Sequence, residues 1–223
     1  MNYIWTQSKQ HLKDPGSAIT HFIALLFALV GIAPLLLKSQ KNGNPTGMYP
    51  LAVFMISMVL LYGASTIYHS LNISKEINLR LRKLDHAMIF VLIAGSYTPV
   101  CALVLKGSLG RTLLITIWSI AILGILFKMC WITCPHWLSS TMYILMGWAV
   151  VFAFKPLLST LSKPAFLWLL MGGVIYTIGG IIYALKLPIF NQRHKYFGSH
   201  EIFHLFVMGG SLCHFIFMYE YIA

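Results

Sequence analysis

Three histidines and one aspartate are the residues of this sequence whose types and spacing suit metal chemistry. His200 and His204 are four residues apart, which places both imidazoles on one helix face with about 5 to 6 Å between their β-carbons. Zinc binds imidazole nitrogen at about 2.0 to 2.1 Å and prefers four ligands, so the pair needs a third protein ligand and leaves one position for water. His69 is the expected third ligand. The sequence therefore predicts a Zn²⁺ site formed by His69, His200 and His204.

Asp85 and Ser65 are expected to support this site. Asp85 can hydrogen-bond the water of the metal, either to hold it for attack or to take its proton, and is predicted to be catalytic. Ser65 lies one turn before His69 on the same helix face and is predicted to belong to the catalytic group with Asp85, where it would orient the groups around the metal. Ionisable groups within membrane spans cost several kcal/mol unless they are paired or hydrated, so their convergence favours a functional site. The alternative is that the histidines only hydrogen-bond across helices.

Glu201 completes the pattern HEIFH at residues 200–204, which matches the H-E-x-x-H of zinc metalloproteases, where the glutamate is the general base. The extended form of that motif needs glycine and histidine at positions that hold Val207 and Gly210 here, which excludes that protease class. Intramembrane zinc proteases are similar in carrying H-E-x-x-H within a span, but their aspartate ligand follows the motif, whereas Asp85 precedes it. The role of Glu201 therefore stays open.

Two further histidines and one acid lie near the predicted site. His21 follows Asp14 by seven residues, and it is expected to pair with Asp14 or to neighbour the site rather than to bind the metal. His214 lies ten residues beyond His204, hence about 15 Å further along the helix. That depth excludes His214 from the same metal and predicts an interior hydrogen bond.

Composition indicates the elements that must position these residues. Of the 223 residues, 58% are hydrophobic and 9% are charged, against about a quarter charged in soluble proteins. Apolar runs of about 20 residues, long enough to cross a bilayer, recur between short polar breaks. The sequence predicts an all-α, seven-transmembrane helix bundle, a single domain over residues 1–223 with 1–18 as a short cytoplasmic segment. The predicted spans are Ile19–Leu37, Leu51–Leu71, Asp85–Leu105, Arg111–Phe127, Ser140–Phe154, Ala165–Leu187 and Ser199–Tyr219.

The distribution of charge predicts a cytoplasmic N-terminus. Since successive spans alternate in direction, the end of span two and the starts of spans three and seven share one face, which gathers His69, Asp85 and the last-span histidines in the cytoplasmic leaflet. The net charge of +11 is expected to meet lipid headgroups, with no nucleic acid as partner. This orientation places ten of the sixteen Lys and Arg residues in the cytoplasm: Lys9, Lys13, Lys75, Arg80, Arg82, Lys83, Lys128, Lys186, Arg193 and Lys195.

Several motifs follow one another along nearly the whole chain: Ser65-Thr-Ile-Tyr-His69-Ser, Lys83-Leu-Asp85-His, Ala94-Gly-Ser-Tyr-Thr-Pro99, Gly147-Trp148, Ser199-His200-x-x-x-His204 and Gly209-Gly-Ser-x-x-His214-Phe215. Together they resemble the hemolysin III family, bacterial proteins that share a seven-span superfamily with the progestin and adipoQ receptors and the alkaline ceramidases. The resemblance implies a multi-pass protein of the bacterial plasma membrane with zinc on the three histidines, Asp85 reaching it through water and Ser65 nearby. It also implies that Glu201 is not an obligatory base, because that position varies in the family. At position 14 the family usually carries glutamate, and this chain has aspartate.

The leading functional hypothesis is a zinc-dependent hydrolase of lipid amide or ester bonds. A site one or two helical turns below the headgroups meets the linkage region of a lipid that enters sideways, and the ceramidase side of the superfamily implies amide hydrolysis. The alternatives are a non-catalytic regulator or sensor of membrane lipid homeostasis, a pore-forming cytolysin (hemolysin), and an intramembrane zinc protease. A pore needs polar faces on several helices, and the predicted fourth span offers few polar side chains.

Overall fold

The computed structural model describes residues 12–105, 107–185 and 197–223, and within these ranges every regular element is helical. Seven helical segments of the described residues are long and apolar enough to cross a membrane, which confirms the predicted fold class. Four short 3₁₀ or π segments adjoin the α-helices: Pro45–Gly47, Val100–Val104, Ala149–Ala153 and Met218–Ile222. The α-helices are α1 (Pro15–Lys41), α2 (Met48–Ser70), α3 (Lys75–Pro99), α4 (Gly107–Cys130), α5 (His136–Trp148), α6 (Phe154–Thr160), α7 (Lys163–Leu185) and α9 (Ser199–Phe217).

Some sequence predictions fall outside the described residues. They concern most of the N-terminal segment, the end of the sixth span at Leu187, and four of the side chains assigned to the cytoplasm: Lys9, Lys186, Arg193 and Lys195.

The third span begins earlier than predicted, at Lys75 instead of Asp85. The hydroxyl of Ser74 accepts a hydrogen bond from the backbone N–H of Ile77 at 3.2 Å and thereby caps the first turn. Apolar residues indicate which part of a helix contacts lipid, whereas backbone hydrogen bonds and a capping side chain determine where the helix starts. The first turns of α3 are therefore helical although they are polar. Asp85 therefore lies about 15 Å along α3 rather than at its opening.

The fifth span continues beyond its predicted end at Phe154. The helical path runs from His136 to Thr160 through α5, the 3₁₀ segment Ala149–Ala153 and α6. Pro156 lies in the first turn of α6, where a backbone N–H has no partner within the helix, so the ring is tolerated there.

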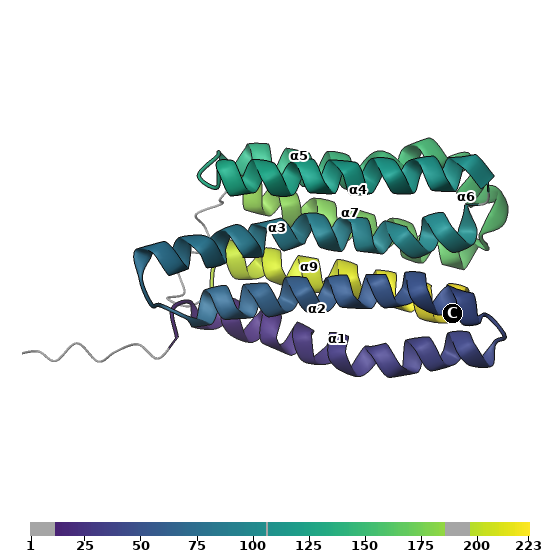
Figure 1. The fold of residues 1–223 in the computed structure, drawn as a ribbon, viewed down its shortest axis with the longest axis horizontal. Helices are drawn as coiled ribbons and strands as arrows, with labels where there is room; N and C mark the ends of the chain where they lie inside the picture. The colour runs from purple at the N-terminus through teal and green to yellow at the C-terminus, as the bar shows by residue number, and fades with distance from the viewer. Residues whose placement is uncertain (1–11, 106, 186–196) are drawn as a thin grey trace, which may run out of the picture.

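Six membrane-crossing segments close into a ring. Going round it, α1 contacts α2, α2 contacts α3, α3 contacts α5, α5 contacts α7, α7 contacts α9, and α9 returns to α1. Helix α4 packs outside this ring, mainly against α3. Figure 1 shows the helices running side by side, with the starts of α1, α3 and α9 and the end of α2 gathered at one end of the bundle. This end carries the predicted site.

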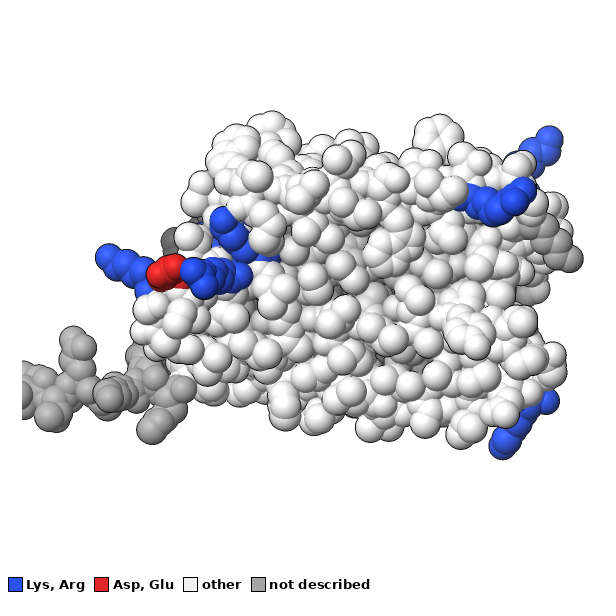
Figure 2. Space-filling model, viewed as in Figure 1, with Lys and Arg blue, Asp and Glu red and all other residues white. Residues whose placement is uncertain are grey.

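The sides of the bundle present large apolar residues, as a lipid-facing surface requires. Phe27 and Val30 are each 73% exposed, and Ile115 is 68% exposed. Figure 2 shows charged side chains at the two ends of the molecule and an uncharged band between them. The chain is a multi-pass membrane protein, as its sequence predicts.

Lys128, one of the residues assigned to the cytoplasmic side, is buried, with an exposed fraction of 1%. Its ammonium group donates to the hydroxyl of Ser139 at 2.5 Å and to the sulfur of Cys134 at 3.0 Å. These partners join the end of α4 to the start of α5. Lys128 thus contributes to helix packing and adds no surface charge for the cytoplasmic face.

Candidate metal centre

The three predicted ligands converge between α2 and α9. His69 lies in the last turn of α2, and His200 and His204 occupy the first two turns of α9. One ring nitrogen from each of the three lies within 4.8 Å of the others, and His69 and His204 are buried. Among the described residues this is the group of side chains that can hold a metal ion.

The spacing of these nitrogens fits a small tetrahedral cation. The Nε2 atoms of His69 and His200 are 3.3 Å apart. Two ligands about 2.0 to 2.1 Å from one zinc ion in tetrahedral geometry stand about 3.4 Å from each other. For the nitrogens that are up to 4.8 Å apart, a small movement of the imidazole side chains toward one another would bring them to this spacing. Three imidazole nitrogens are a donor set that zinc accepts in proteins.

Asp14 orients the first of these histidines. Its backbone N–H donates to the carbonyl of His69 at 2.9 Å, which fastens the start of α1 to the end of α2. Its carboxylate then accepts a hydrogen bond from Nδ1 of His69 at 3.0 Å, which leaves Nε2 with a lone pair for a metal. That hydrogen bond, aided by the charge of the imidazole, lowers the pKa of Asp14 below its ordinary value. The predicted alternative, a pair between Asp14 and His21, is wrong because the carboxylate is bound to His69.

Replacing Asp14 by asparagine should weaken zinc binding by about 10- to 100-fold, because the amide holds the His69 tautomer less firmly and raises its basicity less. Competition with a zinc indicator measures this change on the purified protein. Glu76→Gln is the matched control, since Glu76 pairs with Arg80 in the exposed first turns of α3 and should not alter affinity. An unchanged affinity in Asp14→Asn would contradict the orienting role.

Thr20 orients His204, a contact that the sequence analysis missed. The Thr20 hydroxyl donates to the carbonyls of Gly16 and Ser17, at 2.9 and 3.0 Å, so its oxygen is left to accept from Nδ1 of His204, 3.3 Å away. Nε2 of His204 then carries the lone pair. The signal lay in the spacing of Ser17, Thr20 and His21, three and four residues apart on one face of an apolar helix.

His21 neighbours the site without joining its ligands. Its ring stacks on that of His204, with 3.6 Å between centroids and 7° between planes, and meets Tyr62 edge to face. His21 is outside the group whose nitrogens converge, and neither of its own nitrogens makes a hydrogen bond within the described residues. His21 therefore lies beside the three-histidine group, the second of the two positions expected for it.

Both carboxylate oxygens of Glu201 are occupied. One accepts from the hydroxyl of Ser17 at 2.5 Å, and the other accepts from the backbone N–H of Gly198 at 2.7 Å. The first bond ties α9 to α1, and the second caps the N-terminus of α9. Glu201 thus helps to position α9, the helix that carries His200 and His204. This structural role accounts for the glutamate in the H-E-x-x-H pattern.

Glu201→Ala should destabilise the protein by about 2 kcal/mol, because it removes a helix cap and a charged hydrogen bond between helices. If the hydrolase hypothesis holds, the activity of the zinc-loaded variant should stay within about threefold of wild type, against the 10²- to 10⁴-fold loss expected for a general base. Thermal unfolding in detergent and an activity assay separate the two. A large loss of activity at unchanged stability would restore the protease-like role.

Asp85 and Ser65 line a cavity that His200 and His204 also line. This cavity, of about 150 Å³, lies inside the ring of helices, and its mostly apolar wall receives no residue from α4. Asp85 is buried and close enough to interact electrostatically with His21 and His200, while one carboxylate oxygen lies 3.3 Å from Nδ1 of His86. The Ser65 hydroxyl has no hydrogen-bond partner within the described residues, and Ser65 is one of the residues that line the cavity.

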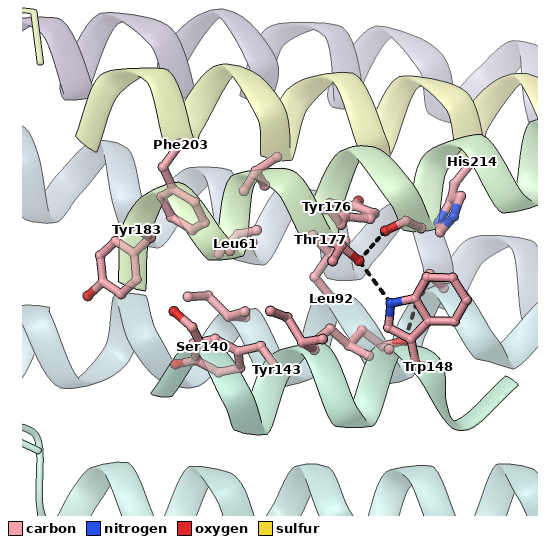
Figure 3. Close-up of a pocket in the computed structure, with 18 of the residues that line it drawn as sticks. Leu61, Leu92, Ser140, Tyr143, Trp148, Tyr176, Thr177, Tyr183, Phe203 and His214 are labelled. Atoms are coloured by element: carbon pink, nitrogen blue, oxygen red, sulfur yellow. Dashed lines mark hydrogen bonds between the residues drawn. The ribbon is translucent and has the colours of Figure 1, made fainter. Parts of the chain in front are cut away.

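His214 lies at the far end of the same cavity, as its distance along the last helix predicts. Figure 3 shows His214 and Trp148 at one end and Tyr183 and Ser140 at the other. Because the Tyr183 ring also contacts His200, with 6.1 Å between centroids, that second end is the metal end. The interior hydrogen bond predicted for His214 is not well formed: the Leu169 carbonyl lies near the ring, but neither nitrogen reaches hydrogen-bond geometry.

Sequence comparisons match this chain to one family and to named relatives. It fits the model of the family described as "Haemolysin-III related" over residues 9–215. It is 38% identical over 203 residues to the "Hemolysin-3 homolog" of Bacillus subtilis (strain 168), covering 91% of each chain. It is 37% identical over 219 residues to "Hemolysin-3" of Bacillus cereus, covering 97% of this chain and 95% of the other. A more distant match, 25% identical over 238 residues, is the "Adiponectin receptor protein" of Drosophila melanogaster, with 91% of this chain and 49% of that protein covered.

Proposed function

The chain belongs to the haemolysin III family, and we propose that it is a zinc-dependent hydrolase of lipid amide or ester bonds. The observation that carries this proposal is that His200 and His204, two of the three converging histidines, line a mostly apolar cavity that a buried carboxylate also lines. Metal-capable nitrogens, an acid–base group and space for an alkyl chain therefore adjoin one another inside the membrane-spanning bundle.

His69, His200 and His204 are the residues that would hold the ion. When bound, zinc supplies a Lewis acid that polarises a carbonyl and lowers the pKa of water. Asp85 would accept the proton of the attacking water, because Asp85 lines the same cavity as His200 and His204. Asp14 and Thr20 would keep two imidazoles in the tautomer that directs Nε2 to the ion.

The cavity favours a lipid over a peptide as substrate. Its wall is built from side chains such as Leu61, Leu92 and Phe203, which can cover an alkyl chain but leave the backbone groups of a peptide without partners (Figure 3). The occupied carboxylate of Glu201 also weighs against the intramembrane protease alternative. Amides and esters of fatty acids combine a hydrolysable carbonyl with the apolar chain that this cavity would accept.

The test is release of free fatty acid from lipid amides and esters by the purified, zinc-loaded protein. We expect release that disappears after chelation and in His69→Ala, and that returns when zinc is added back to the chelated wild type. Release that persists in His69→Ala would refute metal-dependent hydrolysis. Bound zinc without release from any lipid tested would favour the non-catalytic regulator.

A further inference from the structure

His214 is a polar side chain that faces the cavity with no well-formed hydrogen bond. Its exposed fraction is 8%, and neither ring nitrogen reaches hydrogen-bond geometry with any described residue. The ring packs edge to face on Tyr176, with 5.4 Å between centroids, and against Gly172, where the absence of a Cβ makes room for it. An imidazole that is buried without a hydrogen-bond partner loses the hydrogen bonds it would make to water. The unpaired state of His214 therefore needs an explanation.

The other polar groups around His214 are already paired with one another. The indole N–H of Trp148 donates to the Thr177 hydroxyl at 2.9 Å, and that hydroxyl donates to the carbonyl of Gly173 at 2.7 Å. The Tyr176 hydroxyl lies 2.7 Å from that of Ser211. At this end of the cavity His214 is therefore a lining side chain of the described residues whose buried ring nitrogens lack a hydrogen-bond partner (Figure 3).

The metal end of the cavity also has polar side chains without hydrogen-bond partners, and there a reacting substrate would give them partners. His21 and Ser65 line the cavity there without hydrogen-bond partners in the described residues, next to the three ligands. A reacting lipid linkage and its water would meet them. The cavity thus has open polar groups at one end, a mostly apolar middle, and one further open polar group at the other end.

We propose that His214 recognises a hydroxyl group on the acyl chain of the lipid, far from the bond that is cleaved. This inference rests on the proposed function, because it places the carbonyl of the substrate at the histidine group. The imidazole offers both a donor and an acceptor nitrogen, so a hydroxyl can pair with it whichever nitrogen carries the proton.

The spacing along α9 sets where on the chain this hydroxyl falls. His204 and His214 are ten residues apart on one helix, hence about 15 Å. An extended alkyl chain with staggered carbon–carbon bonds of about 1.5 Å covers that distance in about a dozen carbons. The substrate class is therefore a lipid whose acyl chain carries a hydroxyl about twelve carbons from the carbonyl.

The experiment measures binding of free fatty acids to the purified zinc-loaded protein by titration calorimetry in detergent. The probes are stearic acid and a stearic acid with one hydroxyl about twelve carbons from the carboxyl group. The wild type should bind the hydroxylated acid about three- to tenfold more tightly, the advantage of one hydrogen bond that water would otherwise satisfy. His214→Phe should lose this preference while binding stearic acid at least as well.

Two further variants keep the test decisive. Ser96→Ala is the matched control, because the Ser96 hydroxyl also lines the cavity but donates to the carbonyl of Ile93 at 2.8 Å, so the preference should persist. Gly172→Ala should abolish it without touching His214 chemically, because a Cβ there would lie 2.5 Å from Nε2 of His214 and displace the ring. If His214→Phe does not fold, Gly172→Ala still tests whether the preference for the hydroxylated acid depends on the position of the His214 ring.

Equal affinity of the wild type for the two acids would overturn the inference, as would a preference that survives in both His214→Phe and Gly172→Ala. Because binding of free acids needs no turnover, these outcomes differ from failure of the proposed function. Hydrolysis without the preference would refute only the hydroxyl site. A preference without hydrolysis of any lipid would refute the enzyme and leave a binding protein.

Discussion

Replacing His204 by alanine should remove the metal. Zinc content of the purified protein should fall from near one equivalent in the wild type to near none, with an affinity at least about 100-fold lower. The reason is that groups that only orient a ligand are worth about 10- to 100-fold, and His204 is expected to supply a ligand atom itself. Its nitrogen belongs to the group that converges within 4.8 Å, and Thr20 holds the ring in place. Metal analysis after gel filtration measures the change.

His214→Ala is the matched control, since it removes a second buried histidine from the same helix. This variant should keep its zinc, because His214 lies at the other end of the cavity and outside the converging group. Equal metal loss in both variants would point to unfolding of α9 instead of loss of a ligand. Full zinc content in His204→Ala would refute the three-histidine site. Unfolding curves of zinc-free samples show whether the variants start from an intact fold.

The seven spans were predictable because a bilayer demands long apolar helices, but their order around the ring was not. Phe27 is 73% exposed and Phe54 is fully buried, yet both are phenylalanines within an apolar helix. In a soluble protein the buried and the exposed face of a helix differ in polarity, whereas in a membrane both faces are apolar. The sequence pattern therefore hardly distinguishes residues that pack against other helices from residues that contact lipid. The early start of α3 was missed for a related reason, because polar turns capped by Ser74 carry no apolar signal.

The grouping of the three histidines followed from two strong constraints, the four-residue spacing on α9 and the alternation of spans that brings the end of α2 to the same face. What supports the histidines depends on contacts that spacing does not encode. Asp14 reaches His69 because the backbone of residues 13 and 14 bonds to the end of α2, a junction formed only in the folded chain. The roles of Thr20 and Glu201 likewise depend on α1 lying beside α9.

Those supporting contacts imply that the site has two carboxylates with separable tasks. Asp14 bonds to a ligand and lies at the edge of the bundle, whereas Asp85 lines the cavity and bonds to none of the three ligands within the described residues. The first should therefore govern how tightly the ion is held, and the second should govern what happens to the substrate. This division can be measured because excess zinc compensates for weak binding but not for a missing proton acceptor.

Asp85→Asn should lower the rate of fatty acid release by about 10²- to 10⁴-fold at saturating zinc, the range for loss of a general base. Its zinc affinity should stay within about tenfold of wild type, because the amide keeps the shape of the side chain and no ligand loses its partner. Asp14→Asn is the counterpart: its activity should be low at limiting zinc and recover when zinc is raised. If added zinc rescued Asp85→Asn as well, Asp85 would be a binding group, and the proton acceptor would have to be sought among the other polar residues at the metal end, His21 and Ser65.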